Sequence, residues 1–383
     1  MKIYKIITHV GGSIAFAAMQ WLILIFISKY MGVSEAGSFS YYLAFFAPLG
    51  IFCAFNLKSV YSSDSLEKFD MEQYEAIRSI LIIIYLISSM SFLVLQKEYL
   101  LIGLMVFMVK LIEVSADLIY GEWVKKGESQ LFGYSKILKL FLFVLMFFIL
   151  YFLDFERFIY VIYPLAFILG YFLFDLRKTD IKLKFDLNKS KPIFLGVLPF
   201  VLTSFFISFN TSVPRFYLNY FYDKKIIAEF MYLTYFTTIM LLPLTSLYQA
   251  ILPKIKKYQK NILAITMIYN FVFLMFFWFF CDYILREVYN YNQIIPKEIK
   301  LLIMASMFIQ ALIVYVNMLY VSSMKFRKIF KVTLINTFIV LILSFIMIDK
   351  LGYIGVYYAG VISSIILLIN LYFNYRRDGI NEL

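Results

Sequence analysis

Three charged residues lie inside one apolar stretch of the chain, residues 99–120: Lys110, Glu113 and Asp117. In a helix, a turn of 100° per residue would bring all three within about 60° of one another on one face. A charge at the centre of a bilayer costs about 2.5–3.5 kcal/mol, so we expect this face to meet a wet interior or a partner. Two roles stay open: Lys110 and Glu113 neutralise each other, or Lys110 attracts an anion while Glu113 or Asp117 exchanges H⁺ or Na⁺.

Three further residues could meet an anionic group or a coupling ion. Arg215 follows Pro214 near the end of an apolar run, where its guanidinium could hold a diphosphate or reach towards lipid phosphates. Lys58 and Asp64 follow the second apolar run, where Lys58 could meet a pyrophosphate or act as a topology-setting cation. His9, the single histidine, has no partner at a useful spacing, so we expect a structural role for it.

The elements that must position these residues are apolar runs. Of 383 residues, 63% are hydrophobic and 16% charged, against roughly 45–50% and about 25% in soluble domains. About 20 apolar residues cross a bilayer as a helix, so the length accommodates about twelve transmembrane helices and no soluble domain. The runs predict an all-α integral membrane protein with spans near 6–28, 39–57, 78–96, 99–120, 136–153, 157–174, 193–216, 227–250, 262–285, 299–321, 329–348 and 353–373.

Basic residues are unevenly distributed between the two sides of this arrangement. With the N-terminus inside, 25 of the 36 Lys and Arg residues fall on the cytoplasmic side, among them Arg78, Lys136 and Lys139 as residues at helix ends. This bias predicts that both termini are cytoplasmic. The same bias explains the net charge of +12, so no nucleic-acid partner is needed to account for it. The basic residues are spread over many short loops and do not form one binding patch.

No enzyme motif is present. The sequence has no GxxxxGK[ST] loop, no HExxH and no Ser/His/Asp constellation, and Cys53 and Cys281 lie in apolar stretches without metal-ligand spacing. We therefore expect no enzyme activity, no metal and no cofactor. Energy for any transport would come from an H⁺ or Na⁺ gradient, the membrane potential or consumption of the substrate on the far side.

The two halves of the chain show a weak internal repeat. The segment ADLIYGEWVKK (116–126) aligns with VNMLYVSSMKF (316–326) at an offset of 200, which pairs Asp117 with Asn317, Tyr120 with Tyr320 and Lys125 with Lys325. Both segments have the same predicted sidedness. The repeat predicts two parallel six-helix lobes, residues 1–190 and 191–383, related by a pseudo-two-fold axis along the membrane normal.

Several stretches together resemble the polysaccharide (O-antigen) flippases of the multidrug/oligosaccharidyl-lipid/polysaccharide exporter superfamily. They are KYMGVSEAGSFSYYLAFFAP (29–48), NLKSVYSSD (56–64), VKLIEVSADLIYGEW (109–123), the long stretch at 203–258 and LGYIGVYYAGVISSI (351–365). The resemblance covers nearly the whole chain. Ala228 replaces the family's usual glycine and Lys58 its usual arginine, which weakens any detailed transfer of binding residues.

The resemblance implies a monomer of two six-helix lobes in the bacterial inner membrane, opening alternately to either side. It implies that the chain flips an undecaprenyl-diphosphate-linked oligosaccharide, for O-antigen of lipopolysaccharide or another surface polysaccharide, with a polysaccharide polymerase as a partner and lipids around it. The predicted cationic substrate site is Lys110, Arg215 and Lys58, and the candidates for ion coupling are Glu113, Asp117 and Asp64. The alternatives are a polysaccharide polymerase, which would need a larger external loop, and a drug or cation antiporter, which would need an anionic pocket.

Overall fold

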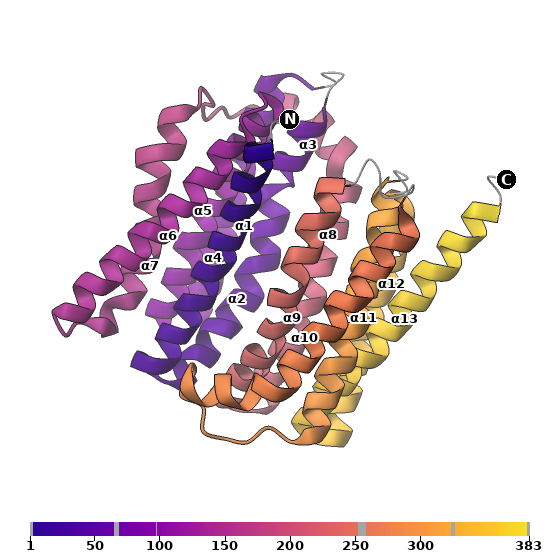
Figure 1. Ribbon diagram of the computed structural model, residues 1–383. Coiled ribbons are helices and arrows are strands. Elements are labelled where there is room, and N and C mark those ends of the chain that lie inside the picture. Colours follow the sequence, from indigo (N-terminus) through magenta and orange to yellow (C-terminus); the bar gives the residue numbers. More distant parts are fainter. Residues whose placement is uncertain (1–2, 65–68, 97, 252–257, 323–325, 381–383) are drawn as a thin grey trace. The chain divides into compact units, whose positions relative to one another are not determined.

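The computed structural model describes residues 3–64, 69–96, 98–251, 258–322 and 326–380, and these residues form helices without a strand (Figure 1). Twelve of the described helices have twelve or more residues, which confirms the predicted number of spans. Residue 325, which the internal repeat pairs with Lys125, lies outside the described residues. The predicted spans coincide with helices, and the ends of these helices differ from the predicted ends by up to seven residues.

The chain divides into two compact units, residues 1–208 and 209–383. The first contains α1 (Ile3–Phe26), α2 (Val33–Ala54), α3 (Leu57–Ser63), α4 (Met71–Leu95), α5 (Leu100–Lys125), α6 (Ser129–Phe152) and α7 (Ile159–Gly170). Helix α8 (Leu187–Phe221) contributes to both units, and the second unit continues with α9 (Lys224–Ile251), α10 (Gln259–Glu287), α11 (Lys297–Ser322), α12 (Phe326–Leu351) and α13 (Gly355–Ile380). The boundary we expected, after residue 190, falls near the start of α8, whereas the contacts divide the chain in the middle of this helix.

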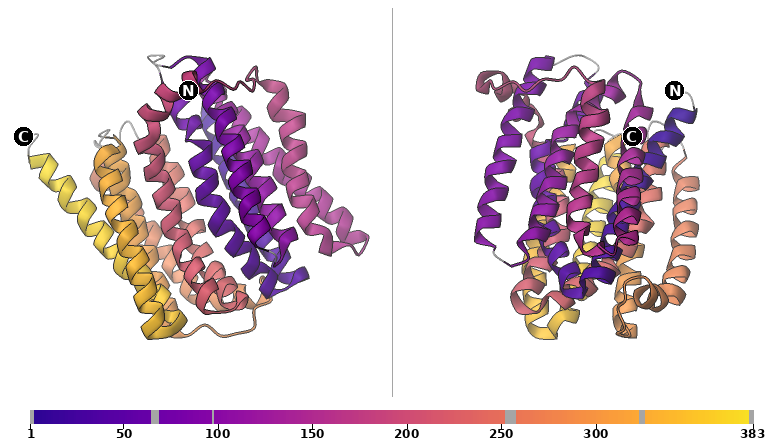
Figure 2. Two further views of the ribbon diagram at one scale, coloured as in Figure 1. Left: turned by 180° about the vertical axis from the view of Figure 1, so that it is seen from behind. Right: turned by 90° about the vertical axis from the view of Figure 1, so that its left-hand side faces the viewer.

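Ten stretches among the described residues are long and apolar enough to cross a membrane. One of them, Lys328–Tyr375, contains both α12 and α13. Helix α5 is not among the ten because its 26 residues include Lys110, Glu113, Asp117 and Glu122. Successive long helices within each unit run in alternating directions (Figure 2), as short connections require. The chain is a multi-pass membrane protein.

Helices α1 and α6 pack closely in the first unit because two glycines meet at their crossing. A Cβ added to Gly12 would lie 2.4 Å from the Cα of Gly133, and one added to Gly133 would lie 2.1 Å from the carbonyl oxygen of Thr8. Small residues at such crossings let helix backbones approach in a membrane. The contact fixes the side chains of α1 over those of α6.

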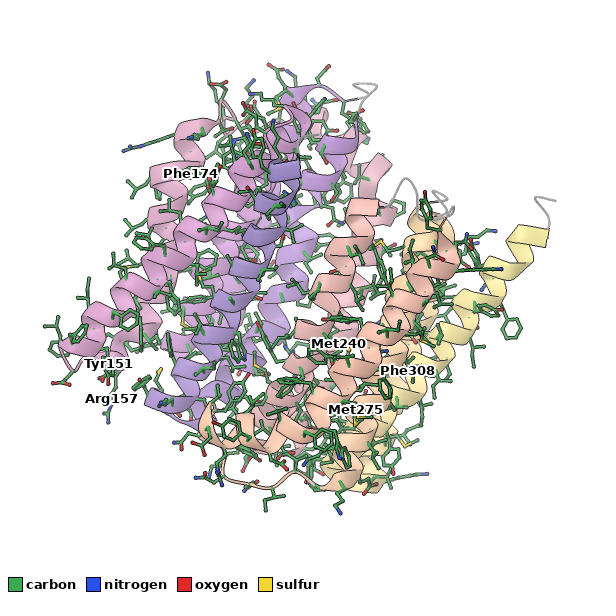
Figure 3. The ribbon with its side chains drawn as sticks, in the orientation of Figure 1. Tyr151, Arg157, Phe174, Met240, Met275 and Phe308 are labelled. Carbon is green, nitrogen blue, oxygen red and sulfur yellow. The ribbon has the colours of Figure 1, made fainter. Side chains whose placement is uncertain are left out.

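A π turn, Tyr171–Asp175, continues α7 and brings two polar side chains inward. Such turns insert one extra residue into a helix and often mark functional positions. Phe174, which lies inside this turn, and Arg157 are at opposite ends of the α7 segment (Figure 3). The end with Phe174 is the same end of the first unit at which α1 begins (Figure 1). The polar residues of the turn therefore lie towards the N-terminal end of α1.

Candidate functional site

The charged face of α5 contains an ion pair. Lys110 Nζ donates to Glu113 Oε2 at 2.8 Å, and the side chains are 13% and 21% exposed. The stem of Lys110 lies against Gly50 of α2, where a Cβ would come 3.8 Å from its Cδ. The neutralising role of this pair is thus present in the structure, and Lys110 is not a free cation.

Two of the predicted residues, Lys58 and Asp117, are brought together. The short helix α3 lies against α5 because Gly121 leaves room for it: a Cβ there would lie 3.0 Å from the Cα of Lys58. The backbone N–H of Lys58 donates to Asp117 Oδ2 at 2.9 Å. Asp117 therefore holds the start of α3, and the ammonium group of Lys58 is left for other contacts.

The ammonium groups of three lysines gather around aromatic rings in the first unit, and we call Lys58, Lys136 and Lys139 the lysine cluster. Lys58 Nζ lies 3.6 Å from the centroid of Phe132. Lys136 Nζ lies 3.9 Å from the centroid of Phe16 on α1 and 5.9 Å from that of Phe132. Two cations thus share one phenyl ring, an arrangement in which cation–π attraction partly replaces lost hydration.

Lys139, the third member, has a complete set of polar partners. Its Nζ donates to Asp175 Oδ2 at 2.5 Å, to the Tyr120 hydroxyl at 2.8 Å and to Ser135 Oγ at 3.1 Å. Tyr120 in turn donates to Asp175 Oδ2 at 3.1 Å. Lys139 and Asp175 are 1% and 0% exposed, so this is a buried ion pair that joins α6 to the π turn after α7.

Lys58 and Lys136 differ from Lys139, because within the described part of the chain neither ammonium group has a carboxylate within ion-pair distance. Lys136 is 5% exposed and lies in electrostatic range of two other cations, Lys58 and Lys139. Of the nearby acids, Glu113 is paired with Lys110 and Asp175 with Lys139, and Asp117, which accepts from the backbone N–H of Lys58, lies in electrostatic range of both Lys58 and Lys136. The three lysines of the cluster therefore face two carboxylates, Asp117 and Asp175, which leaves one basic side chain in excess.

The same end of α5 is tied to its neighbours by further polar contacts. Arg78 is 3% exposed and donates from Nε to the Ser115 carbonyl at 2.9 Å and from Nη2 to the Tyr171 hydroxyl at 3.1 Å. Glu122 accepts from Lys126 Nζ at 2.6 Å and from Thr179. The hydrogen bond to Glu122 raises the pKa of Lys126, which caps the helix. These contacts make the surroundings of the lysine cluster rigid.

Asp64 and Arg215 do not belong to the lysine cluster. Asp64 ends α3 and accepts from the Tyr74 hydroxyl at 2.9 Å and from the Phe69 N–H at 3.2 Å, so it helps to hold a turn. Arg215 lies in the second unit, within α8, and its buried Nε has no hydrogen-bond partner among the described residues. Its guanidinium keeps the donor capacity that we expected at this position.

The sequence analysis missed the role of Lys136 and Lys139 by assigning them to the start of a helix on the cytoplasmic side. The structure corrects this: α6 begins at Ser129, so Lys136 lies seven residues, or about 10 Å, inside the helix. Asp175 and the structural role of Arg78 were missed in the same way. One signal was available, because Lys136 and Lys139 are three residues apart in an apolar run and must share a helix face.

The arrangement favours binding of an anion. A buried ammonium group without a paired carboxylate is unfavourable, so an anion that supplies several oxygens would relieve the cost at Lys136 and would also accept from the half-buried Lys58. Lysine is a common ligand of phosphate groups as a compact point charge. No group of three or more His, Cys, Asp or Glu residues among the described positions could hold a metal ion.

Comparison with known structures identifies the class of fold. The chain has the fold of the transporters of the MOP superfamily, which consist of twelve helices in two lobes. One similar structure is the lipid II flippase MurJ in an inward closed conformation, with a TM-score of 0.67 and 18% identity over 98% of this chain and 88% of that one. Another is an outward-facing multidrug resistance transporter of the MATE family, with a TM-score of 0.64 and 15% identity over 97% of this chain and 94% of that one.

Among curated proteins, the chain is similar to the capsular polysaccharide biosynthesis protein CapF of Staphylococcus aureus. The two are 26% identical, and the match covers 94% of this chain and 96% of the relative. No protein-family model matches the chain. The resemblance to the exporter superfamily is thus confirmed at the level of the fold, together with a relative in polysaccharide biosynthesis.

Proposed function

We propose that this protein flips a polyprenyl-diphosphate-linked oligosaccharide, in the form of undecaprenyl-diphosphate repeat units of a surface polysaccharide, from the cytoplasmic to the outer leaflet of the bacterial inner membrane. The observation that carries the proposal is the lysine cluster, in which the ammonium groups of Lys58 and Lys136 share the ring of Phe132 without a carboxylate partner. A transporter fold with a buried excess of positive charge suits an anionic cargo.

The diphosphate is the part of such a substrate that the lysine cluster would bind. Its oxygens would accept hydrogen bonds from Lys58 and Lys136, while Lys139 stays with Asp175 and orients α6. The oligosaccharide is polar and the polyprenyl chain is apolar, so the first would travel through a hydrated path and the second would remain in lipid. The relatives support a cargo of this class, since one is named for lipid II flipping and one for capsular polysaccharide biosynthesis.

The two alternative functions fit these residues less well. A drug or cation antiporter needs anionic groups at its binding site, whereas in the first unit Glu113 and Asp175 are paired with lysines and Asp117 accepts from the backbone N–H of Lys58. A polysaccharide polymerase needs room for a donor and an acceptor outside the membrane, and the connection between α10 and α11 covers only residues 288–296. A flippase needs neither feature.

The test is flipping of a fluorescent undecaprenyl-diphosphate oligosaccharide in proteoliposomes that contain the purified protein. We expect Lys136→Met and Lys58→Met each to slow flipping by about tenfold to a hundredfold, because a charge-assisted hydrogen bond contributes about 1.5–3 kcal/mol. Lys182→Met is the matched control, since Lys182 is an exposed lysine outside the long helices, and we expect wild-type rates for it.

Two outcomes would contradict the proposal. The first is that well-folded wild-type protein carries none of several oligosaccharide head groups, and the second is that the Met variants flip as fast as Lys182→Met. Lys110→Met and Arg215→Met belong in the same series. The Lys110 variant should have a smaller effect than Lys136→Met, because Lys110 is already neutralised by Glu113.

A further inference from the structure

A second buried charge cluster lies in the second unit, at the beginning of α9. Glu229 is the sixth residue of this helix and is 4% exposed. Its Oε2 is 2.5 Å from the hydroxyl of Tyr291, which belongs to the connection between α10 and α11. Its Oε1 is buried and has no hydrogen-bond partner among the described residues. The pair thus joins the start of α9 to residues 288–296.

The surroundings of Glu229 are aromatic and contain no cation that pairs with it among the described residues. Tyr232, one turn along α9, stacks on Tyr289 with ring centroids 4.3 Å apart and meets Tyr291 edge-on at 5.8 Å. Four titratable side chains from neighbouring elements face this region: Tyr291, Tyr353, Tyr357 and Cys281. Beyond them, Asp282 and Lys300 form an ion pair with each other. An ionised carboxylate would therefore be buried with the Tyr291 hydroxyl as its one hydrogen-bond donor among the described residues.

The hydrogen bonds at Tyr291 indicate which group carries a proton. The Tyr291 hydroxyl oxygen lies 2.5 Å from Glu229 Oε2 and 2.8 Å from Gln293 Oε1, and a phenol has one hydrogen for these two acceptor oxygens. Burial and the bond to Glu229 raise the pKa of Tyr291, so the phenol keeps its hydrogen. In this orientation of the Gln293 amide, both contacts are satisfied when Glu229 is protonated, donates to Tyr291 and lets Tyr291 donate to Gln293. The amide turned over would donate to Tyr291 and let Tyr291 donate to Glu229, so the burial of Glu229 without a cation is what favours the protonated form.

We propose that Glu229 is a proton-binding site of the second unit and that its protonation closes the connection 288–296 onto the start of α9. When the proton leaves, the carboxylate has neither a cation nor a second donor, and it gains hydration only if Tyr291 and its segment move away. The pair Glu229–Tyr291 is then a two-state element that a proton biases. A role of this site in coupling transport to protons rests on the proposed function. The binding of a proton at Glu229 does not depend on that function.

The pH dependence follows directly from this arrangement. Low pH keeps Glu229 protonated and the segment 288–296 closed, and rising pH ionises Glu229 and opens the segment. Tyr291 does not contribute in this range, because its pKa lies above the ordinary tyrosine value of about 10. The segment is thus fully closed at pH values below the range in which Glu229 ionises, and it opens as the pH rises through that range.

The experiment is hydrogen–deuterium exchange of the full chain in lipid nanodiscs, comparing each variant with the wild type at the same pH over a series of pH values. In the wild type we expect the protection factor of residues 288–296 to fall about tenfold when Glu229 becomes ionised. A tenfold change corresponds to the free energy of about one hydrogen bond. Glu229→Gln imitates the protonated group and should stay protected at every pH. Tyr291→Phe should be unprotected at every pH.

Glu287→Gln is the matched control, because Glu287 is an exposed acid at the end of α10 beside the same segment. It should behave as the wild type does. The proposal is overturned if Glu229→Gln keeps the pH dependence of the wild type, or if the wild type shows none.

A second measurement keeps the proposal testable if Glu229→Gln does not fold. Infrared difference spectra between low and high pH should contain the C=O band of a protonated carboxyl group, and Glu229→Asp should shift that band. A band that does not move in the Asp variant would overturn the assignment. Neither experiment uses a lipid-linked substrate, so a failure to flip lipid in proteoliposomes would reject the proposed function and leave the proton site standing.

Discussion

Two buried lysines on the same helix, Lys136 and Lys139, have opposite energetic roles. Lys139 is paired with Asp175 at 2.5 Å and bonded to Tyr120, so its charge is compensated. Lys136 lies 3.9 Å from the ring of Phe16 and has no carboxylate partner among the described residues. An ammonium group that is unfavourable in the folded protein is a candidate for ligand binding, because sites of function often retain local instability.

This contrast makes a prediction for stability. Lys139→Met should lower the free energy of unfolding by about 3–5 kcal/mol, because it leaves Asp175 charged and buried without a partner. Asp175→Asn should be similarly harmful, and the double variant should lose less than the sum of the two. Lys136→Met should leave the stability unchanged or raise it. Thermal unfolding of the purified variants in detergent measures all four, and a destabilised Lys136→Met would show that its ammonium group is already compensated.

At the scale of the helix, the crossing of α1 and α6 decides whether Phe16 can cover Lys136. The crossing depends on Gly12 and Gly133, because any side chain on either would overlap the opposite backbone. Helix propensity favours alanine over glycine, so only packing can make Gly12→Ala harmful. The position of the lysine cluster is therefore set by two residues that carry no chemistry.

The neighbouring glycine supplies a matched control for this crossing. Gly12→Ala should destabilise the protein by about 1–3 kcal/mol through overpacking, whereas Gly11→Ala should be neutral, because nothing lies within 4 Å of a Cβ at Gly11. The thermal midpoint and the flipping rate of the two variants should be compared. Equal midpoints would mean that the helices separate at this point without cost.

Hydropathy predicted the helices themselves well and their ends less well, and α6 shows why. The predicted span begins at residue 136, but the helix begins at Ser129, because the polar or small residues of 129–135 (SQLFGYS) lower the hydropathy without ending the helix. Their partners come from distant parts of the chain: Asp175 from the π turn after α7 and Phe16 from α1. Spacing along a helix predicted the local pair Lys110–Glu113, but contacts across 36 or more residues need the fold.

At the scale of the whole molecule, the direction of transport depends on which side of the membrane the lysine cluster faces. Within the first unit, the π turn that carries Asp175 lies at the end where α1 begins (Figure 3). If the N-terminus is cytoplasmic, as the distribution of Lys and Arg predicts, the cluster meets a substrate that is made inside the cell. The site Glu229–Tyr291 would then face the outside, where protons enter under a normal gradient.

Labelling of single cysteines with a membrane-impermeant maleimide tests this orientation. Glu128 and Asn292 are exposed residues in connections, and the five long helices α6 to α10 lie between them, so they must be on opposite sides of the membrane. In a protein with Cys53→Ala and Cys281→Ala, we expect Asn292→Cys to react in intact cells and Glu128→Cys to react only after permeabilisation. The two native cysteines are buried, and each replacement by alanine removes one sulfur atom.

The reverse labelling pattern would change the function and not only the orientation. The lysine cluster would then open towards the outer leaflet and could load only a diphosphate that is already outside, which suits import of a carrier lipid better than export of an oligosaccharide. Glu229 would face the cytoplasm and would release protons where it was expected to bind them. Labelling at Asn292 therefore decides between two directions of transport that the same fold and the same charged residues allow.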